Sequence, residues 1–193
     1  TALDTAGNVG RFPSLAIGLD GLGLIAYYDE TNDDLKVAHC NNVECSSAVI
    51  TTLDSPGSVG RYPSLTIGSD GLGLISYVDV SNGRLMVIHC DNQECTSSLM
   101  GATPLDASGH LINWTSATIG ADGLGLIGYV DATARELKIA HCSNVTCSQA
   151  SLLAVAADAY KVSVAHGVDG LPLLAFYQEG APFEGFLSVL HCA

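Results

Sequence analysis

Positively charged residues are scarce in this chain of 193 residues. There are 7 Lys and Arg against 20 Asp and Glu, which gives a formal net charge of −13 at pH 7. Binding to the phosphates of a nucleic acid or to an anionic membrane surface requires clustered cations. The sequence therefore argues against both kinds of partner.

Long apolar runs are also missing, although hydrophobic residues make up 48% of the chain. The longest runs, such as Leu22 to Tyr28, have the length of a strand, whereas a helix that spans a bilayer needs about 20 residues. We therefore expect no membrane insertion. Apolar spacing typical of an amphipathic helix is missing as well, and Gly is frequent, with 21 residues. Few charged residues, at 14%, together with high apolar content, exclude a disordered chain.

An internal repeat fills the sequence. The segment from Ile17 to Tyr27 (IGLDGLGLIAY) recurs with small changes from Ile67 and Ile119, and a more divergent copy begins at His166. The period is roughly 50 residues, which lies in the range of propeller blades. A His-Cys pair keeps the same spacing, at His39-Cys40, His89-Cys90, His141-Cys142 and His191-Cys192. We expect one domain, residues 1–193, of four units: 5–54, 55–106, 107–158, and 159–193 together with 1–4.

Each unit has the pattern of an antiparallel β-sheet. In the second unit we expect strands near 63–68, 72–79, 84–90 and 98–105, separated by Asp-Gly and Asn-Gly hairpin signals. The second strand is apolar on both faces, so both of its faces need cover from neighbouring sheets. Four-stranded blades packed around an axis provide that cover. The predicted fold is therefore an all-β, four-bladed β-propeller of four-stranded antiparallel blades.

The two ends of the chain predict how the ring closes. Thr1-Ala-Leu-Asp4 matches Thr51-Thr-Leu-Asp54, which ends a fourth strand, and the last unit stops after its third strand. We expect the N-terminal segment to complete the last blade. This arrangement resembles the strand-swapped closure of β-propellers, and the units look like the repeats of secreted bacterial propeller proteins. The Gly-x-Asp-Gly hairpin is similar to the Asp-box turn of sialidases, without the Ser and Trp of that motif. An open arc, or a half-ring completed by a second chain, is the alternative.

Six of the seven cysteines form closely spaced pairs that predict disulfides: Cys40-Cys45, Cys90-Cys95 and Cys142-Cys147. A hairpin places such partners at a distance that suits a disulfide, and four converging zinc ligands are not available within one unit. Three disulfides imply an oxidising compartment, so we expect a secreted or cell-surface protein. Cys192 has no partner at the equivalent spacing. Its thiol is free, or its partner was lost with a longer N-terminus, or it forms a bond to another subunit. Asn113 and Asn144 stand in glycosylation sequons.

The loops between units predict a binding surface. An aromatic residue beside a polar one stands at nearly equivalent places in the four units, and carboxylates follow the second strands. The candidates for sugar binding are Arg11, Phe12, Arg61, Tyr62, Asn113, Trp114, Tyr160, Asp29, Asp79 and Asp131. The competing interpretation is structural: the aromatics plug the channel, while Arg11 and Arg61 pair with Asp29 and Asp79.

The sequence gives little indication of catalysis or of metal binding. The chain has four Arg, and two of these, Arg84 and Arg135, begin third strands, so the three-arginine site that sialidases need is not formed. The four repeated His lie on apolar strand faces and are expected to be buried hydrogen-bonding residues. We therefore expect no enzymatic activity, no cofactor and no metal.

Two functions remain. The first is a non-enzymatic extracellular structural or interaction protein that assembles with copies of itself, as a homo-oligomer, into a surface layer or filament. The alternative is a lectin-like propeller that binds glycans through the aromatic loops. The sequence favours the first by a small margin.

Overall fold

A computed structural model describes residues 1–98, 100–180 and 184–192, and these residues form antiparallel sheets. The first sheet contains β1 (Arg11–Ile17), β2 (Gly23–Asp29), β3 (Asp34–Cys40) and β4 (Ala48–Asp54). The second contains β5 (Arg61–Ile67), β6 (Gly73–Asp79), β7 (Arg84–His89) and β8 (Thr103–Asp106). The third contains β9 (Ile112–Ile119), β10 (Gly125–Asp131), β11 (Glu136–Cys142) and β12 (Ala150–Ala157). The fourth contains β13 (Ala159–His166), β14 (Pro172–Gly180) and β15 (Glu184–His191). No helix that could cross a membrane occurs in this described part of the chain.

The second strand of each middle sheet is buried along its whole length. Every residue of β6 and β10 is buried, and the apolar core consists of clusters between consecutive sheets. These strands lie inside their own sheets and have a neighbouring sheet on each face. The prediction of all-β units with apolar second strands is therefore confirmed.

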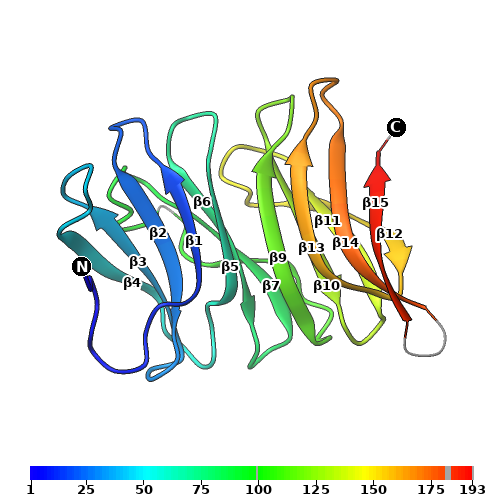
Figure 1. Cartoon of the computed structure of the whole chain (residues 1–193), viewed down its shortest axis with the longest axis horizontal. Coiled ribbons are helices and arrows are strands. Elements are labelled where there is room, and N and C mark those ends of the chain that lie inside the picture. Colours follow the sequence, from blue (N-terminus) through cyan, green and yellow to red (C-terminus); the bar gives the residue numbers. More distant parts are fainter. Residues whose placement is uncertain (99, 181–183, 193) are drawn as a thin grey trace.

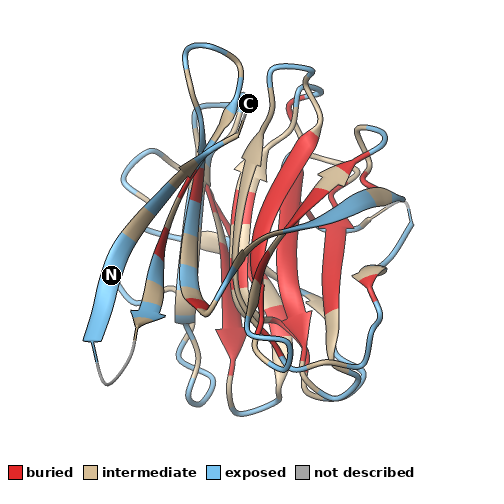
Figure 2. Cartoon of the chain, turned by 90° about the vertical axis from the view of Figure 1, so that its right-hand side faces the viewer, coloured by how far each residue is buried: buried red, intermediate tan, exposed pale blue. Residues whose placement is uncertain are grey.

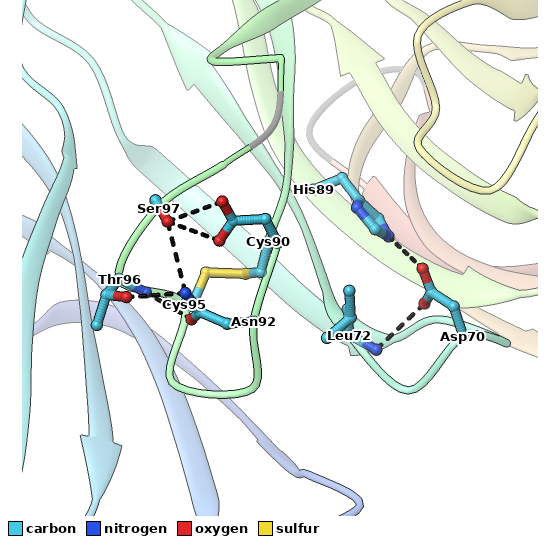
Figure 3. The surroundings of a disulfide bond; sticks show 9 residues. Asp70, Leu72, His89, Cys90, Asn92, Cys95, Thr96 and Ser97 are labelled. Carbon is cyan, nitrogen blue, oxygen red and sulfur yellow. Dashed lines mark hydrogen bonds and ion pairs between the residues drawn. A yellow bond between two sulfur atoms is a disulfide. The ribbon is translucent and has the colours of Figure 1, made fainter.

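The repeated Gly-x-Asp-Gly segment is the turn between the first two strands of each sheet. In the second sheet the Leu72 amide donates to Asp70 Oδ1 at 3.1 Å, and Gly71 adopts a φ of +82°, which glycine tolerates without strain. His89 Nε2 lies 2.9 Å from Asp70 Oδ2, at ion-pair distance but without hydrogen-bond geometry (Figure 3). The turn is thus connected to the third strand, which explains why the Asp-Gly and His-Cys landmarks recur together.

The sheets form a row in which the first strands lie side by side (Figure 1). In β1, β5 and β9, the first three of these inner strands, a serine accepts a hydrogen bond from the backbone of the next inner strand. The Leu65 amide donates to Ser14 Oγ and the Ala117 amide to Ser64 Oγ, both at 2.9 Å, and the Val164 amide donates to Ser116 Oγ at 3.0 Å. These bonds fix the position of each inner strand relative to the next.

A tyrosine–aspartate hydrogen bond joins consecutive units. Tyr77 donates to Asp54 at 2.6 Å, and Tyr129 donates to Asp106 at 2.8 Å. In both cases the aspartate ends the outer strand of one sheet and the tyrosine lies in the second strand of the next. Tyr27 makes the same bond to Asp4 at 2.7 Å.

The predicted closure of the ring is wrong for the described residues. Asp4 binds Tyr27 and Lys36 in the first sheet, and the fourth sheet has three strands with β15 at its edge. The two termini lie at opposite ends of the row (Figure 1). β15 is largely exposed (Figure 2), with Leu187 82% accessible. The Asp4–Tyr27 bond holds the N-terminal segment on the first sheet, out of reach of the fourth.

All three predicted disulfides are present. The Cα atoms of Cys90 and Cys95 are 4.9 Å apart, and the other two pairs are spaced alike. An asparagine two residues after the first cysteine shapes each loop; in the second, the Thr96 amide donates to Asn92 Oδ1 at 3.0 Å (Figure 3). Cys192 is free and half-buried.

Candidate functional site

The first strands begin with a bulge that places one side chain in an unusual direction. Phe12, Tyr62, Trp114 and Lys161 all have positive φ, between 49° and 52°, at positions where the strand register shifts. A β-bulge redirects a side chain away from the regular alternation of a strand. The four side chains therefore occupy equivalent places at the start of neighbouring inner strands.

Three of these side chains form a continuous stack, which we call the aromatic column: Phe12, Tyr62 and Trp114. The ring centroids of Phe12 and Tyr62 are 4.6 Å apart, and those of Tyr62 and Trp114 are 4.4 Å apart. Each ring is partly exposed. Because the rings pack on one another, they form one apolar strip across three sheets and not three separate platforms.

Polar side chains flank the aromatic column. Arg11 forms an ion pair and a hydrogen bond with Glu30, which also accepts from Asn8. Asn113 precedes Trp114 and is partly exposed. These groups offer both hydrogen-bond donors and acceptors close to an apolar strip.

The predicted pairing of Arg11 and Arg61 with Asp29 and Asp79 is wrong. Arg11 pairs with Glu30, one residue further along the chain than Asp29. The Arg61 guanidinium lies over the ring of Tyr28, with Cζ 5.4 Å from the ring centroid. Asp29 and Asp79 do not pair with these arginines. Both are buried at the ends of β2 and β6, where they accept hydrogen bonds from the turns that follow.

The repeated carboxylates are parts of turns and do not line the aromatic column. Asp29, Asp79 and Asp131 are 1%, 4% and 0% exposed. Asp79 accepts from the amide of Asn82 at 3.0 Å and from its side chain at 2.8 Å, and Asp29 binds Asn32 in the same way.

Asp131 also contacts neighbouring basic side chains. It accepts from Lys138 at 2.7 Å and lies 2.8 Å from His110 Nδ1. Burial alone would raise the pKa of Asp131, but hydrogen bonds from Lys138, the Ala134 amide and His110 outweigh it and lower the pKa to about 2. The Asp131 carboxylate is therefore ionised at neutral pH, and both of its oxygens have polar partners.

The repeated histidines pair with the turn aspartates. His39, His141 and His191 lie 2.8–2.9 Å from Asp20, Asp122 and Asp169, respectively. His39 and His89 are buried as expected, whereas His141 and His191 are about half exposed. Among the residues that the structure describes, no group of three His, Cys, Asp or Glu is arranged to hold a metal ion.

Cys192 lines a cleft of about 470 Å³ between the third and fourth sheets, together with His141 and His166. Burial raises the pKa of its thiol. A bond from Cys192 to another chain stays a prediction. Of the two sequons, Asn144 lies in an exposed disulfide loop, where its side chain binds Ser148, whereas Asn113 lies within β9.

Tyr160 is not a member of the aromatic column. It occupies the place of Arg11, Arg61 and Asn113, its hydroxyl donates to Glu179 at 3.0 Å, and its ring lies against Tyr177. The residue equivalent to the column rings is Lys161, whose Nζ lies 5.0 Å from the centroid of the Trp114 ring. Aligning the four units at the residue before the bulge could have shown this.

No protein-family model matches the sequence, and a search of curated proteins finds no match either. Solved structures are similar in fold. One is a protein of unknown function from Dyadobacter fermentans, with a TM-score of 0.70 and 11% identity over 93% of this chain. This chain spans 60% of the length of that protein.

Two further similar structures carry named activities. An α-L-arabinofuranosidase from Lactobacillus brevis has a TM-score of 0.62 and 14% identity, over 96% of this chain and 68% of its own. An endo-arabinase from Bacteroides thetaiotaomicron has a TM-score of 0.62 and 10% identity, over 100% of this chain and 79% of its own. These likenesses support a β-propeller fold. At such low identity they show the fold alone.

The prediction of a non-enzymatic structural protein that assembles into a surface layer or filament was wrong. The similar structures with named activities are carbohydrate-processing enzymes, not components of such assemblies. Composition and an unpaired cysteine, on which that prediction rested, describe the surface of a protein and not its ligand.

Proposed function

We propose that this protein binds carbohydrate at the aromatic column. The observation that carries the proposal is the column itself: three partly exposed rings in contact across three sheets, flanked by Arg11, Glu30 and Asn113. Apolar sugar faces pack on aromatic surface, while charged and amide side chains bind sugar hydroxyls. The carbohydrate-related names of similarly folded proteins agree with this choice.

The column geometry favours one extended site over several repeated ones. Neighbouring rings cover part of each other's faces, so a saccharide chain contacts their exposed parts in succession. Titration calorimetry is expected to give one binding site per chain for an oligosaccharide of several residues. A stoichiometry of three or four short sugars per chain would contradict a single extended site.

We propose further that binding is not followed by hydrolysis. Glycosidases of the common type place two carboxyl groups about 5–9.5 Å apart on either side of the scissile bond. Here the repeated acids Asp29, Asp79 and Asp131 are buried and bonded within turns, and Glu30 is paired with Arg11. The release of reducing sugar from any bound oligosaccharide, at a rate abolished by replacing one carboxylate, would contradict this part of the proposal.

The primary experiment is a glycan array with the intact protein, followed by calorimetry with the best ligand. Trp114→Ala is expected to weaken binding about tenfold, because it removes the largest ring from one end of the strip. Phe186→Ala is the matched control, because Phe186 is an aromatic residue 51% exposed on β15, away from the column.

Thermal unfolding of both variants separates loss of the site from loss of the fold, and Trp114→Phe provides a milder change. An array without any binder would overturn the proposal. A binder whose affinity is unchanged in Trp114→Ala would place the site elsewhere. The three disulfides fit an extracellular location, which we also propose.

A further inference from the structure

Two positive charges at or next to the aromatic column, those of Lys161 and Arg61, have no ion-pair partner in the part of the chain that the structure describes. Of its 7 basic residues, four have a carboxylate oxygen within 4.0 Å: Arg11, Lys36, Arg135 and Lys138. Within residues 1–98, 100–180 and 184–192, the other three, Arg61, Arg84 and Lys161, form no such pair. Unpaired cations are unexpected in a chain with 20 acidic residues.

Two of these three cations lie on aromatic rings at or next to the column. Lys161 is exposed, and its ammonium lies 5.0 Å from the Trp114 centroid. Arg61 lies over Tyr28, and its Nε is buried without a hydrogen-bond partner among the described residues. Attraction to the ring faces holds both charges in place without cancelling them.

Comparison of the units shows why Arg61 is unpaired. Arg11 pairs with Glu30, the residue after Asp29, whereas the residue after Asp79 is Val80, so Arg61 has no equivalent partner. The charge of Asp33 acts on Arg61, but the Asp33 carboxyl accepts hydrogen bonds from the hydroxyls of Tyr28 and Ser58. Hydrogen bonds from Tyr28 and Ser58, and then the charge of Arg61, lower the pKa of Asp33, but no ion pair forms.

We propose that the saccharide bound at the aromatic column is anionic, with carboxylate or sulfate groups that contact Lys161 and lie in the positive field of Arg61. This inference rests on the proposed function. The net charge of −13 does not oppose it at physiological salt, because charges further away than about 8 Å are largely screened. The local cations therefore determine the preference for a short charged oligosaccharide.

Calorimetry with matched probes tests the charge preference. The first pair is an oligogalacturonate and its methyl ester, and the second is a sulfated galactan oligosaccharide and its unsulfated form. In at least one pair, the charged member is expected to bind about three- to tenfold more tightly, and to lose that advantage in 0.5 M salt, where the Debye length falls to about 4 Å. The pair that shows the difference identifies which acidic group is recognised.

Lys161→Gln is expected to weaken binding of the charged probe about three- to tenfold while binding of the neutral probe is unchanged. Lys161→Arg is expected to retain the preference. Arg84→Gln is the control, because it makes the same change in net charge at a cation that is also unpaired among the described residues but lies on β7, two strands from β5.

Equal or tighter binding of the neutral member in both pairs overturns the inference, as does an equal effect of Lys161→Gln and Arg84→Gln. If the glycan array instead finds only neutral ligands that depend on Trp114, the inference fails and the proposed function stands. If neither the probes nor the array give any binding, the proposed function itself fails.

Discussion

Replacing Tyr77 by Phe tests the hydrogen bond that joins the first two sheets. Tyr77 is 0% exposed, and its hydroxyl lies 2.6 Å from Asp54 Oδ2. The exchange removes one oxygen and leaves the ring packing in place. Any loss of stability therefore reports on the bond to the carboxylate.

The expected loss follows from the full burial of Tyr77 and the partial burial of Asp54. Burial raises the pKa of Asp54, and the hydrogen bond from Tyr77 acts in the opposite direction by stabilising the ionised form. A hydrogen bond to a charged group contributes roughly 1.5–3 kcal/mol, and water has no access to replace a fully buried hydroxyl. We expect Tyr77→Phe to lower the free energy of unfolding by about 2 kcal/mol.

Two further exchanges provide comparisons. Tyr27→Phe is expected to cost about half as much, because Asp4 keeps hydrogen bonds from Lys36 at 2.7 Å and from the Ala6 amide at 3.1 Å. Tyr177→Phe is the matched control, since Tyr177 is 45% exposed, and it should change stability by less than about 0.5 kcal/mol.

Urea unfolding at pH 7 measures these differences, with fluorescence of the single tryptophan as the signal. A double-mutant cycle with Asp54→Ala, which leaves no side-chain acceptor for the Tyr77 hydroxyl, isolates the pair, and a coupling of about 1–2 kcal/mol is expected. If Tyr77→Phe costs no more than Tyr177→Phe, or if the cycle shows no coupling, the tyrosine–aspartate bond does not stabilise the junction between the sheets.

Three further predictions concern stability. Because the folded pKa of Asp131 is about 2 and the ordinary value is 3.8, its contribution of about 2 kcal/mol is complete above about pH 5 and is lost as the pH falls towards 2. Urea unfolding at pH 5 and pH 2.5 measures this loss, and Asp131→Asn should reduce it. A mild reductant should open Cys40–Cys45 before Cys90–Cys95, because Cys45 is partly exposed whereas both cysteines of the second pair are buried. Alkylation followed by mass spectrometry gives the order of opening, and the reverse order would contradict this prediction. Ser64→Ala should cost about 1 kcal/mol and speed hydrogen exchange at the Ala117 amide, and unchanged exchange would show that this bond does not hold the inner strands together.

The repeat made much of the architecture predictable. A turn such as Asp70-Gly71 and an apolar run such as 72–79 are local signals, because a turn depends on a few adjacent residues and a strand on its own pattern. The disulfides were equally local, with five residues of separation in each pair. The disulfides and the second and third strands of the second unit were predicted with little error, whereas its fourth strand, expected near 98–105, is shorter and begins at Thr103.

The candidate site was predicted only in part. Phe12, Tyr62 and Trp114 were recognised as equivalent residues, but nothing in the sequence marks a bulge with positive φ at these aromatic positions. The fourth position was assigned to Tyr160, although alignment of the four units places Lys161 at the position of the three rings. The burial of Asp29, Asp79 and Asp131 was also not apparent, because a carboxylate after a strand can either face solvent or fold back into its own turn.

The sequence alone determined the strands, the turns, the units and the cystines, since each depends on residues close together in the chain. Tertiary structure decided which units are neighbours, where the N-terminal segment binds and which side chains meet at the inner strands. Those outcomes depend on contacts between residues about 50 positions apart, such as Phe12 with Tyr62, and on the competition of each charge for its partners. No local pattern records the result of that competition, and the unpaired Lys161 beside Trp114 became visible only when the sheets were placed side by side.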